Sequence, residues 1–255
     1  MNNRNQSINP WVICPKPNPH ARVRLFCFHY AGGGTLSFRN WADDLFPGIE
    51  VYLIQLPGRE RRLMESAFTR IEPLVKELKQ AIIPYLEQPF ALLGYSMGAL
   101  LAFELARSLR RDRRKISPEH LFVCARRAPQ IPATKKPIHK LSDPEFLQEL
   151  RRLGGTPDEI LANKELMELF IPTLRADFAV LETYNYYDEP PLNFPITAFG
   201  GSEDTEASRE ELAAWSLQTG ADFNLHILPG DHFFLNSTRS GLLGIVDRIC
   251  RQINV

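Results

Sequence analysis

Short apolar runs alternate along the chain with amphipathic segments. Runs bounded by Gly, Pro or charged residues are typical of buried strands, and they predict strands at residues 23–29, 49–56, 90–93, 121–125, 196–199 and 224–228. Between several of these runs apolar residues recur at helical spacing, which predicts helices at residues 37–45, 71–86, 97–109 and 241–253. Strands that alternate with helices predict an α/β fold with a mostly parallel central sheet and helices on both faces.

One stretch breaks this alternation. Between the fourth and fifth predicted strands only helical spacing recurs, at residues 141–153, 157–162 and 164–181. Gly154-Gly155 and Pro172 are expected to separate these helices. An insertion after a strand of such a sheet is where a lid over a site is found. We therefore predict a helical lid insertion at about residues 128–190 of a single domain spanning residues 1–255, the alternative being a purely structural set of helices.

The motif G-x-S-x-G lies where a predicted strand meets a predicted helix. Gly94-Tyr95-Ser96-Met97-Gly98 follows the run at 90–93 and opens the helix at 97–109. In that setting the motif is typical of the nucleophile elbow of α/β-hydrolases, in which the serine occupies a sharp, strained turn. The helix N-terminus there favours negative charge. The sequence thus predicts an α/β-hydrolase fold with Ser96 as nucleophile; the alternative is an ordinary glycine-flanked turn.

Composition and charge argue against several classes of protein. Lys and Arg number 30, as do Asp and Glu, which argues against a nucleic-acid partner. No apolar run approaches the ~20 residues of a membrane helix. The polar, proline-rich start has no signal-peptide core, so we expect a cytoplasmic protein without a membrane partner. The cysteines lack C-x-x-C spacing and predict free thiols rather than a metal site; they are Cys14, Cys27, Cys124 and Cys250.

A serine hydroxyl becomes a good nucleophile only when a base takes its proton. The six histidines are His20, His29, His120, His139, His226 and His232. His232 lies in the loop after the last predicted strand, which returns to the carboxyl edge of the sheet, and it comes last in the chain order Ser, acid, His of this fold. The sequence predicts His232 as the base. His29 comes too early in the chain for that order. We expect it to have a supporting role beside the glycine loop.

The acid is expected between Ser96 and His232, just beyond a strand. Asp204 lies in the loop after the predicted strand at 196–199, where a carboxylate would fix the imidazole tautomer and stabilise the imidazolium. We prefer Asp204 over the other carboxylates of the region, which are Asp177, Asp188, Glu203 and Asp231.

Acyl transfer also needs two N–H donors for the oxyanion. One is expected from Met97, the residue after the nucleophile. The other is expected from the loop Tyr30-Ala31-Gly32-Gly33-Gly34, and Ala31 is our choice. This loop lacks both G-x-x-x-x-G-K-[ST] and G-x-G-x-x-G, so a nucleotide site is not predicted.

Six motifs together resemble a known family. They are FHYAGG at 28–33, QLPGR at 55–59, GYSMGA at 94–99, LRADF at 174–178, FGG at 199–201 with Asp204, and GDHFFL at 230–235. From about residue 25 to residue 245 the chain resembles type II thioesterases, the free-standing editing enzymes of non-ribosomal peptide and polyketide synthesis. It is also similar to the medium-chain thioesterase of fatty acid synthesis. The family places nucleophile, acid and base at positions matching Ser96, Asp204 and His232, and commonly has histidine in place of Tyr95.

The resemblance implies hydrolysis of acyl groups from the phosphopantetheine thiol of a carrier protein, without a cofactor or metal. Misprimed or stalled acyl groups would be removed and the synthetase restored. Four residues beside the predicted catalytic groups are expected to contact the substrate: Tyr30, Gly32, Tyr95 and Phe233. Apolar residues of the insertion either face the acyl chain or pack the lid: Phe146, Leu150, Leu153, Leu166 and Phe170. A monomer is expected.

Carrier proteins are generally acidic, so a basic surface at the site entrance would favour docking. One candidate cluster consists of Arg126, Arg127, Lys135 and Lys136, and another of Arg59, Arg61 and Arg62. The alternative for both is solvated loop charge.

Two other functions use the same residues differently. A carboxylesterase or lipase acting on small oxygen esters would share every catalytic residue named above. A non-catalytic hydrolase-fold binding protein is the other alternative, and the intact Ser96, Asp204 and His232 argue against it.

Overall fold

The computed structural model describes residues 9–112 and 116–253, and within these ranges seven strands form one sheet. Their order is β1-β3-β2-β4-β5-β6-β7, and all neighbours are parallel except β1 and β3. The strands are β1 (Val12–Ile13), β2 (Val23–Phe28), β3 (Ile49–Ile54), β4 (Phe90–Tyr95), β5 (His120–Cys124), β6 (Ile196–Gly201) and β7 (Phe223–Leu228). The predicted α/β-hydrolase class, a mostly parallel sheet between helices, is confirmed.

Strand β1 was not predicted. It contains two residues, paired with the edge strand β3 through Val12↔Ile54 and Ile13↔Leu53. Two residues are too few to show the alternation by which a strand is recognised. The six predicted strands are all present, with bounds that shift by a few residues.

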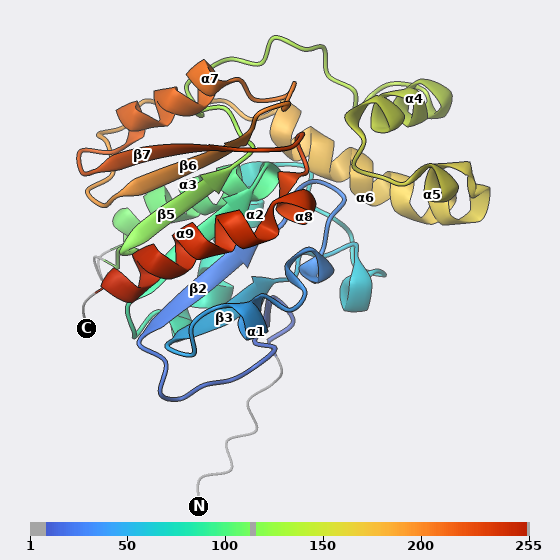
Figure 1. The fold of residues 1–255 in the computed structure, drawn as a ribbon. Coiled ribbons are helices and arrows are strands. Elements are labelled where there is room, and N and C mark those ends of the chain that lie inside the picture. The colour runs from blue at the N-terminus through green and yellow to red at the C-terminus, as the bar shows by residue number, and fades with distance from the viewer. Residues whose placement is uncertain (1–8, 113–115, 254–255) are drawn as a thin grey trace, which may run out of the picture.

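Helices cover both faces of the sheet (Figure 1). One face packs against α2 (Ile71–Ile82) and α3 (Met97–Arg110), and the other against α1 (Trp41–Asp44) and α9 (Arg239–Gln252). Successive residues of β4 therefore face opposite sides: Phe90 and Leu92 pack with α2 and α3, whereas Ala91 and Leu93 pack with α1 and α9. The parallel strands are buried on both faces, as their nearly continuous apolar runs predict.

The helix predicted at 37–45 is in fact two short pieces. A 3-10 turn spans Thr35–Phe38 and α1 begins at Trp41. Between them Arg39 is not helical and Asn40 adopts a left-handed conformation at φ 66°, which interrupts the helical hydrogen bonds. Two short helices near the carboxyl end of the sheet were also not predicted: α7 (Arg209–Ala213) and α8 (Phe234–Ser237).

Three helices between β5 and β6 protrude beyond the sheet (Figure 1). They are α4 (Asp143–Leu153), α5 (Asp158–Ala162) and α6 (Lys164–Glu182). They enclose a small apolar cluster of their own, formed by Phe146, Leu150, Leu161, Met167 and Leu174. Gly154, at φ 72°, ends α4.

Pro172 does not separate helices, contrary to the sequence prediction. Helix α6 continues through it from Lys164 to Glu182. A proline removes one backbone hydrogen bond from a helix. Burial of Met167 before it and of Leu174 after it keeps the two halves of α6 packed as one helix.

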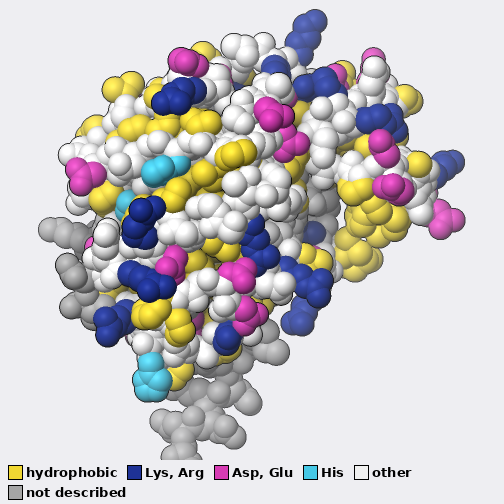
Figure 2. All heavy atoms as spheres, in the orientation of Figure 1, with side chains coloured by type: hydrophobic (Ala, Val, Ile, Leu, Met, Phe, Trp, Pro, Cys, Tyr) yellow, Lys and Arg dark blue, Asp and Glu magenta, His cyan; other side chains and the backbone are white. Residues whose placement is uncertain are grey.

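Figure 2 shows Lys and Arg interspersed with Asp and Glu over the face that carries α9 and β7, as the balanced charge leads one to expect. Hydrophobic side chains gather on the lower side of the protruding α4–α6 segment in that view. Among the described residues, no helix is long and apolar enough to cross a bilayer.

The protein is expected to lose stability in mild acid because two of its histidines are buried. Burial lowers the pKa of His29 to about 4, with Arg59 contributing, and burial likewise lowers the pKa of His120 to about 4. An unfolded histidine titrates near 6.5, so between these pH values the unfolded chain binds more protons. The contribution of these histidines to the free energy of unfolding is therefore complete above pH ~6.5. It falls as the pH drops toward 4, by up to about 3 kcal/mol for each histidine.

Urea unfolding at pH 7 and pH 4.5 measures this loss. Carboxylates that titrate over this range also lower the stability, so a variant is needed to isolate the contribution of one histidine. His120→Phe removes the titrating group and keeps an aromatic ring beside Phe122, on which His120 stacks. The variant is expected to lose less stability than the wild type between the two pH values. An identical loss in both proteins contradicts the assignment.

Candidate active site

The turn between β4 and α3 places Ser96 at the carboxyl edge of the sheet. Ser96 adopts φ 52° and ψ −108°, a strained conformation for a residue with a side chain. Its N–H donates to Cys124 O at 2.8 Å, which fixes the turn to the neighbouring strand. A Cβ on Gly94 would lie 2.2 Å from Gly98 O, and a Cβ on Gly98 would lie 2.0 Å from Phe28 O. Both glycines of the motif are therefore required by the close approach of backbone.

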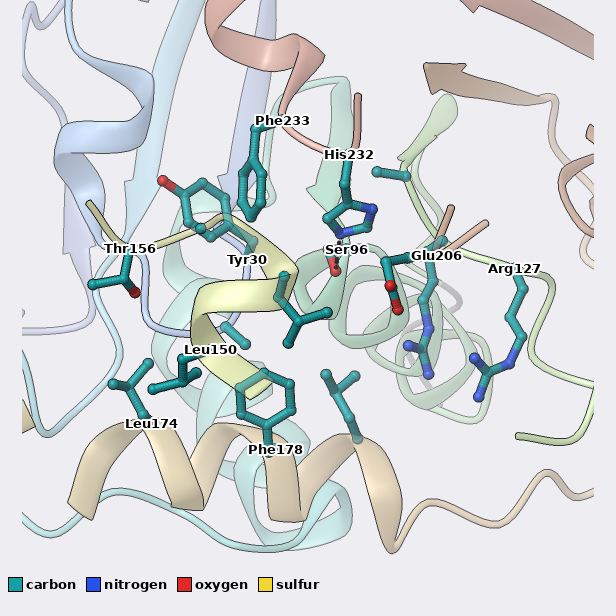
Figure 3. Close-up of a pocket in the computed structure, with 16 residues that line it drawn as sticks. Tyr30, Ser96, Arg127, Leu150, Thr156, Leu174, Phe178, Glu206, His232 and Phe233 are labelled. Carbon is teal, nitrogen blue, oxygen red and sulfur yellow. Dashed lines mark hydrogen bonds between the residues drawn. The ribbon is translucent and has the colours of Figure 1, made fainter. Parts of the chain in front are cut away.

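Ser96, His232 and Asp204 form one hydrogen-bonded chain. His232 Nε2 lies 3.1 Å from Ser96 Oγ, and His232 Nδ1 lies 3.0 Å from both carboxylate oxygens of Asp204. Because a carboxylate only accepts, the Nδ1 nitrogen carries the proton and Nε2 is left to accept from Ser96. Figure 3 shows the His232 ring directed at the Ser96 hydroxyl. This arrangement lets Nε2 take the serine proton.

The Asp204 carboxylate is buried and is oriented by backbone N–H groups of its own loop. Its side chain is 0% exposed. Oδ1 also accepts from the N–H groups of Glu206, at 2.7 Å, and Ala207, at 3.3 Å. These two donors keep the carboxylate oriented toward the imidazole.

Tyr95 does not reach the pocket, although we expected it to contact substrate. Tyr95 is 0% exposed and is not among the residues that line the pocket beside Ser96. The hydroxyl donates to His232 O at 2.7 Å and accepts from Leu235 N–H at 3.3 Å. Burial raises the pKa of Tyr95, so the hydroxyl stays a donor. Tyr95 thus holds the backbone of the loop that carries His232.

Two backbone N–H groups beside Ser96 have no acceptor among the described residues, and they belong to Met97 and Ala31. Met97 N–H opens α3, and Ala31 lines the pocket together with Ser96. The N–H of Gly32 is engaged instead, donating to Asp177 Oδ2 at 2.7 Å, and Gly32 does not line the pocket. This geometry suits Met97 and Ala31 as donors to an oxyanion.

The pocket next to Ser96 has a volume of about 120 Å³. Tyr30, Phe233 and His232 line one side, while α4 and α6 line the opposite side (Figure 3). The lining residues from these helices are Leu150, Leu153, Leu174, Phe178 and Leu181. Tyr30 and Phe233, both expected to contact substrate, thus face the pocket. Of the insertion residues singled out in the sequence, Leu150 and Leu153 line it, whereas Phe146 is fully buried in the cluster of α4–α6.

A third side of the pocket is charged. Arg126, Arg127 and Glu206 line it, and Figure 3 shows Arg127 and Glu206 there. Burial, with the neighbouring Arg127, lowers the pKa of Arg126 to about 9. Lys135 pairs with Glu206 at 2.7 Å, so this cluster runs from the pocket wall to the surface.

The second cluster proposed for docking is not a surface patch. Arg59 and Arg62 are buried, so only Arg61 remains exposed. Arg62 pairs with Glu65 at 2.6 Å and stacks on Trp11, with its guanidinium carbon 4.1 Å from the ring centroid. Both interpretations made from the sequence placed these arginines at the surface, because charged loop residues usually face solvent. Instead, Arg59 pairs with Asp177 and Arg62 pairs with Glu65.

Asp177 is likewise not beside His232. It is buried and pairs with Arg59, Nη1 to Oδ2 at 2.7 Å. Asp231 is exposed and accepts the Phe233 N–H at 2.8 Å. Of the carboxylates weighed as the acid, Asp204 is the one that the structure brings to His232.

The fold and this site define an α/β-hydrolase. Residues 23–254 match the family described as "Thioesterase domain", and the chain belongs to the thioesterase family.

Named relatives agree with this assignment. The chain is 43% identical to the gramicidin S biosynthesis protein GrsT of Aneurinibacillus migulanus, over 97% of this chain and 95% of that protein. Among solved structures it is similar to the type II thioesterase BorB from the borrelidin biosynthetic cluster, with 36% identity, a TM-score of 0.84, and coverage of 94% of this chain and 96% of BorB. It is also similar to YbtT, a type II thioesterase from the yersiniabactin NRPS/PKS pathway, with 30% identity, a TM-score of 0.83, and coverage of 93% and 97%.

Proposed function

We propose that this thioesterase hydrolyses acyl groups from the phosphopantetheine thiol of carrier proteins, and so clears misprimed or stalled groups from a non-ribosomal peptide or polyketide synthetase. The observation that carries the proposal is the Ser96–His232–Asp204 chain, which opens into a pocket with apolar walls. The names of the relatives support the substrate class, since YbtT is described as a type II thioesterase of an NRPS/PKS pathway.

The first half of the reaction forms an acyl-enzyme. Ser96 Oγ attacks the thioester carbonyl carbon while its proton passes to His232 Nε2, and Asp204 stabilises the resulting imidazolium. The carbonyl oxygen becomes an oxyanion that accepts from the N–H groups of Met97 and Ala31. The carbon–sulfur bond then breaks, and the pantetheine thiol leaves with the proton that His232 held.

The second half releases the acid. Water gives a proton to His232 Nε2 and attacks the acyl carbon, forming a second oxyanion at the same two N–H groups. Collapse of this intermediate breaks the bond to Ser96 Oγ, which recovers its proton from His232. Ser96, His232 and Asp204 are restored, and no cofactor takes part in either half.

The pocket volume favours a small acyl group. About 120 Å³ is slightly less than the ~150 Å³ cavity that admits a benzene molecule. The walls from α4 and α6 are apolar near Ser96, so an alkyl chain of a few carbons fits them in this structure. The insertion at about residues 128–190, which contains helices α4–α6, would act as the lid over this pocket and would have to move to admit a longer chain.

The proposal also covers the compartment, the oligomeric state and the protein partner of the enzyme. The four cysteines are free thiols, which supports a reducing compartment such as the cytoplasm. We propose a monomer that meets an acidic carrier protein through the cluster of Arg126, Arg127, Lys135 and Lys136, because this cluster leads from the surface to the pocket wall.

Carrier domains loaded with acetyl, butyryl and longer acyl groups test the proposal directly. Intact-protein mass spectrometry before and after exposure to the enzyme measures the loss of each acyl group. We expect the short acyl groups to be removed, with kcat/KM for acyl-carrier protein above that for the matching acyl-CoA and p-nitrophenyl ester. The acidic surface of a carrier protein can contact the whole basic cluster, whereas CoA offers only its phosphates and the ester offers no charge. A clear preference for the oxygen ester would instead identify a carboxylesterase.

A further inference from the structure

A buried carboxylate joins helix α6 to the loop that carries Ala31. Asp177 Oδ2 accepts from the Gly32 N–H at 2.7 Å and from Arg59 Nη1 at 2.7 Å, while Oδ1 accepts from Arg59 Nη2 at 2.8 Å. Asp177 is 3% exposed and Arg59 is 7% exposed. Burying an ion pair is costly unless its hydrogen bonds are well satisfied, and here one loop amide adds a third hydrogen bond to the two from Arg59.

The segment from Gly58 to Glu60 reinforces this connection on both sides. Arg59 Nη1 also donates to Gly33 O at 3.1 Å, and Gly58 O accepts from Thr173 Oγ1 of α6 at 2.7 Å. Glu60 accepts from Thr35 Oγ1 at 2.8 Å. Three successive residues after β3 therefore tie the glycine loop to helix α6.

The two peptide groups around Ala31 are both fixed. The Tyr30 carbonyl accepts from His29 Nδ1 at 2.8 Å and from Gly33 N–H at 3.0 Å. In a trans peptide the N–H points opposite to the carbonyl, so these two donors turn the Ala31 N–H away from them. The next peptide group is held through its Gly32 N–H by Asp177.

Helix α6 presents different residues to the loop and to the pocket. Thr173 and Asp177 contact the segments just described, whereas Leu174, Phe178 and Leu181 line the pocket, and Figure 3 shows Leu174 and Phe178 rising into it from α6. The fit of α6 on the loop is close, because a Cβ on Gly32 would lie 2.5 Å from Leu174 Cδ2. The helix that lines the pocket is therefore also the helix that holds the loop.

We propose that Asp177, held by Arg59, is a positioning residue: it orients the loop so that the Ala31 N–H meets the oxyanion, and it makes this donor depend on the placement of helix α6. The inference rests on the proposed acyl transfer at Ser96. Asp177 touches neither the substrate nor Ser96, so it acts through the Gly32 amide. Displacement of α6 would release that amide, and the oxyanion would lose a donor.

The test compares Asp177→Asn with the wild type on acyl-carrier protein and on a p-nitrophenyl ester. The amide oxygen of Asn can still accept from Gly32 N–H, but the charge that binds Arg59 is lost. Loss of a whole oxyanion donor lowers kcat by about 10²–10³-fold. We expect about a 10–100-fold decrease in kcat per folded molecule, by the same factor on both substrates and with little change in KM, since the oxyanion is common to both.

Two control variants separate positioning from stability. Asp143→Asn removes an ion pair between Asp143, at the start of α4, and Arg175, which lies on α6 as Asp177 does. This ion pair does not involve the glycine loop. Glu104→Gln removes a partner of the buried Arg107, far from the pocket. Both are expected to keep the wild-type kcat, although Glu104→Gln is expected to lower the unfolding temperature. Circular dichroism gives the folded fraction used to correct every rate.

A folded Asp177→Asn protein with wild-type kcat overturns the inference, and so does an effect confined to KM. If Asp177→Asn does not fold, Arg59→Lys takes its place. Lysine keeps the positive charge but has a single ammonium group where the guanidinium of Arg59 contacts Asp177 through two nitrogens. The same decrease in kcat is expected. Failure of the proposed function looks different. It shows as a wild-type enzyme that cleaves the p-nitrophenyl ester but not acyl-carrier protein, and the Asp177 comparison then still applies to the ester.

Discussion

Ser96→Ala is expected to lower the rate of thioester hydrolysis by about 10⁶-fold, the size of the loss seen when the nucleophilic serine of a triad is removed. The reason is direct: His232 Nε2, 3.1 Å from Ser96 Oγ, would have no nucleophile to deprotonate, and no acyl-enzyme could form. The fold is expected to be unaffected, because alanine loses only the hydroxyl. Stopped-flow or mass-spectrometric assay of acyl-carrier protein gives kcat, and binding of acyl-carrier protein to the variant gives its Kd.

Ser216→Ala is the matched control, since Ser216 is exposed and lies in the turn before β7. It is expected to leave kcat unchanged. Ser96→Ala is further expected to bind acyl-carrier protein with nearly the wild-type Kd and to hold it without cleavage. Wild-type turnover by the Ser96→Ala protein would remove Ser96 from the mechanism altogether.

Gly98→Ala is expected to destabilise the protein by about 3 kcal/mol or more. The added methyl group would lie 2.0 Å from Phe28 O and 2.8 Å from His29 O. Both contacts are with backbone of β2 and the segment after it, so no side chain can rotate away. Relief requires α3 to move away from β2, which also displaces Ser96. Urea unfolding measures the loss of stability, and the residual kcat reports the displacement.

Gly244→Ala makes the same substitution where nothing lies within 4 Å of the new methyl group. Gly244 is in the interior of helix α9, whereas Gly98 is the second residue of α3. Alanine is favoured over glycine there by up to about 1 kcal/mol, so the free energy of unfolding is expected to rise. Equal effects of the two substitutions would contradict the close approach of α3 to β2.

The architecture was largely predictable because it depends on patterns that local sequence carries. Apolar runs such as 90–93 give the strands, and G-x-S-x-G at 94–98 gives the turn and the sheet edge at which the site lies. Chain order then selects His232 among the six histidines, and position after a strand selects Asp204. These inferences need only the direction of each strand and not the packing of side chains.

What could not be predicted depends on packing between distant segments. Pro172 was expected to end a helix, yet burial on both sides keeps α6 continuous. Tyr95 was expected in the pocket, but its hydroxyl reaches back to His232 O. The Arg59–Asp177 pair joins residues 118 apart in the chain. The one available signal was that Asp177 stands three residues after Leu174 and three before Val180, both buried in α6, where helical spacing calls for an apolar residue.

The separate apolar cluster of α4, α5 and α6 has a consequence for how such enzymes diversify. The proposed catalytic residues Ser96, His232 and Asp204 lie on loops at the edge of the sheet, whereas part of the pocket wall comes from inserted helices that have an apolar cluster of their own. New acyl preferences can therefore arise by exchanging those helices, leaving the catalytic residues untouched. The exchange succeeds only where the incoming helix brings side chains equivalent to Asp177 and Thr173, because these two hydrogen-bond helix α6 to the glycine loop and to the segment after β3.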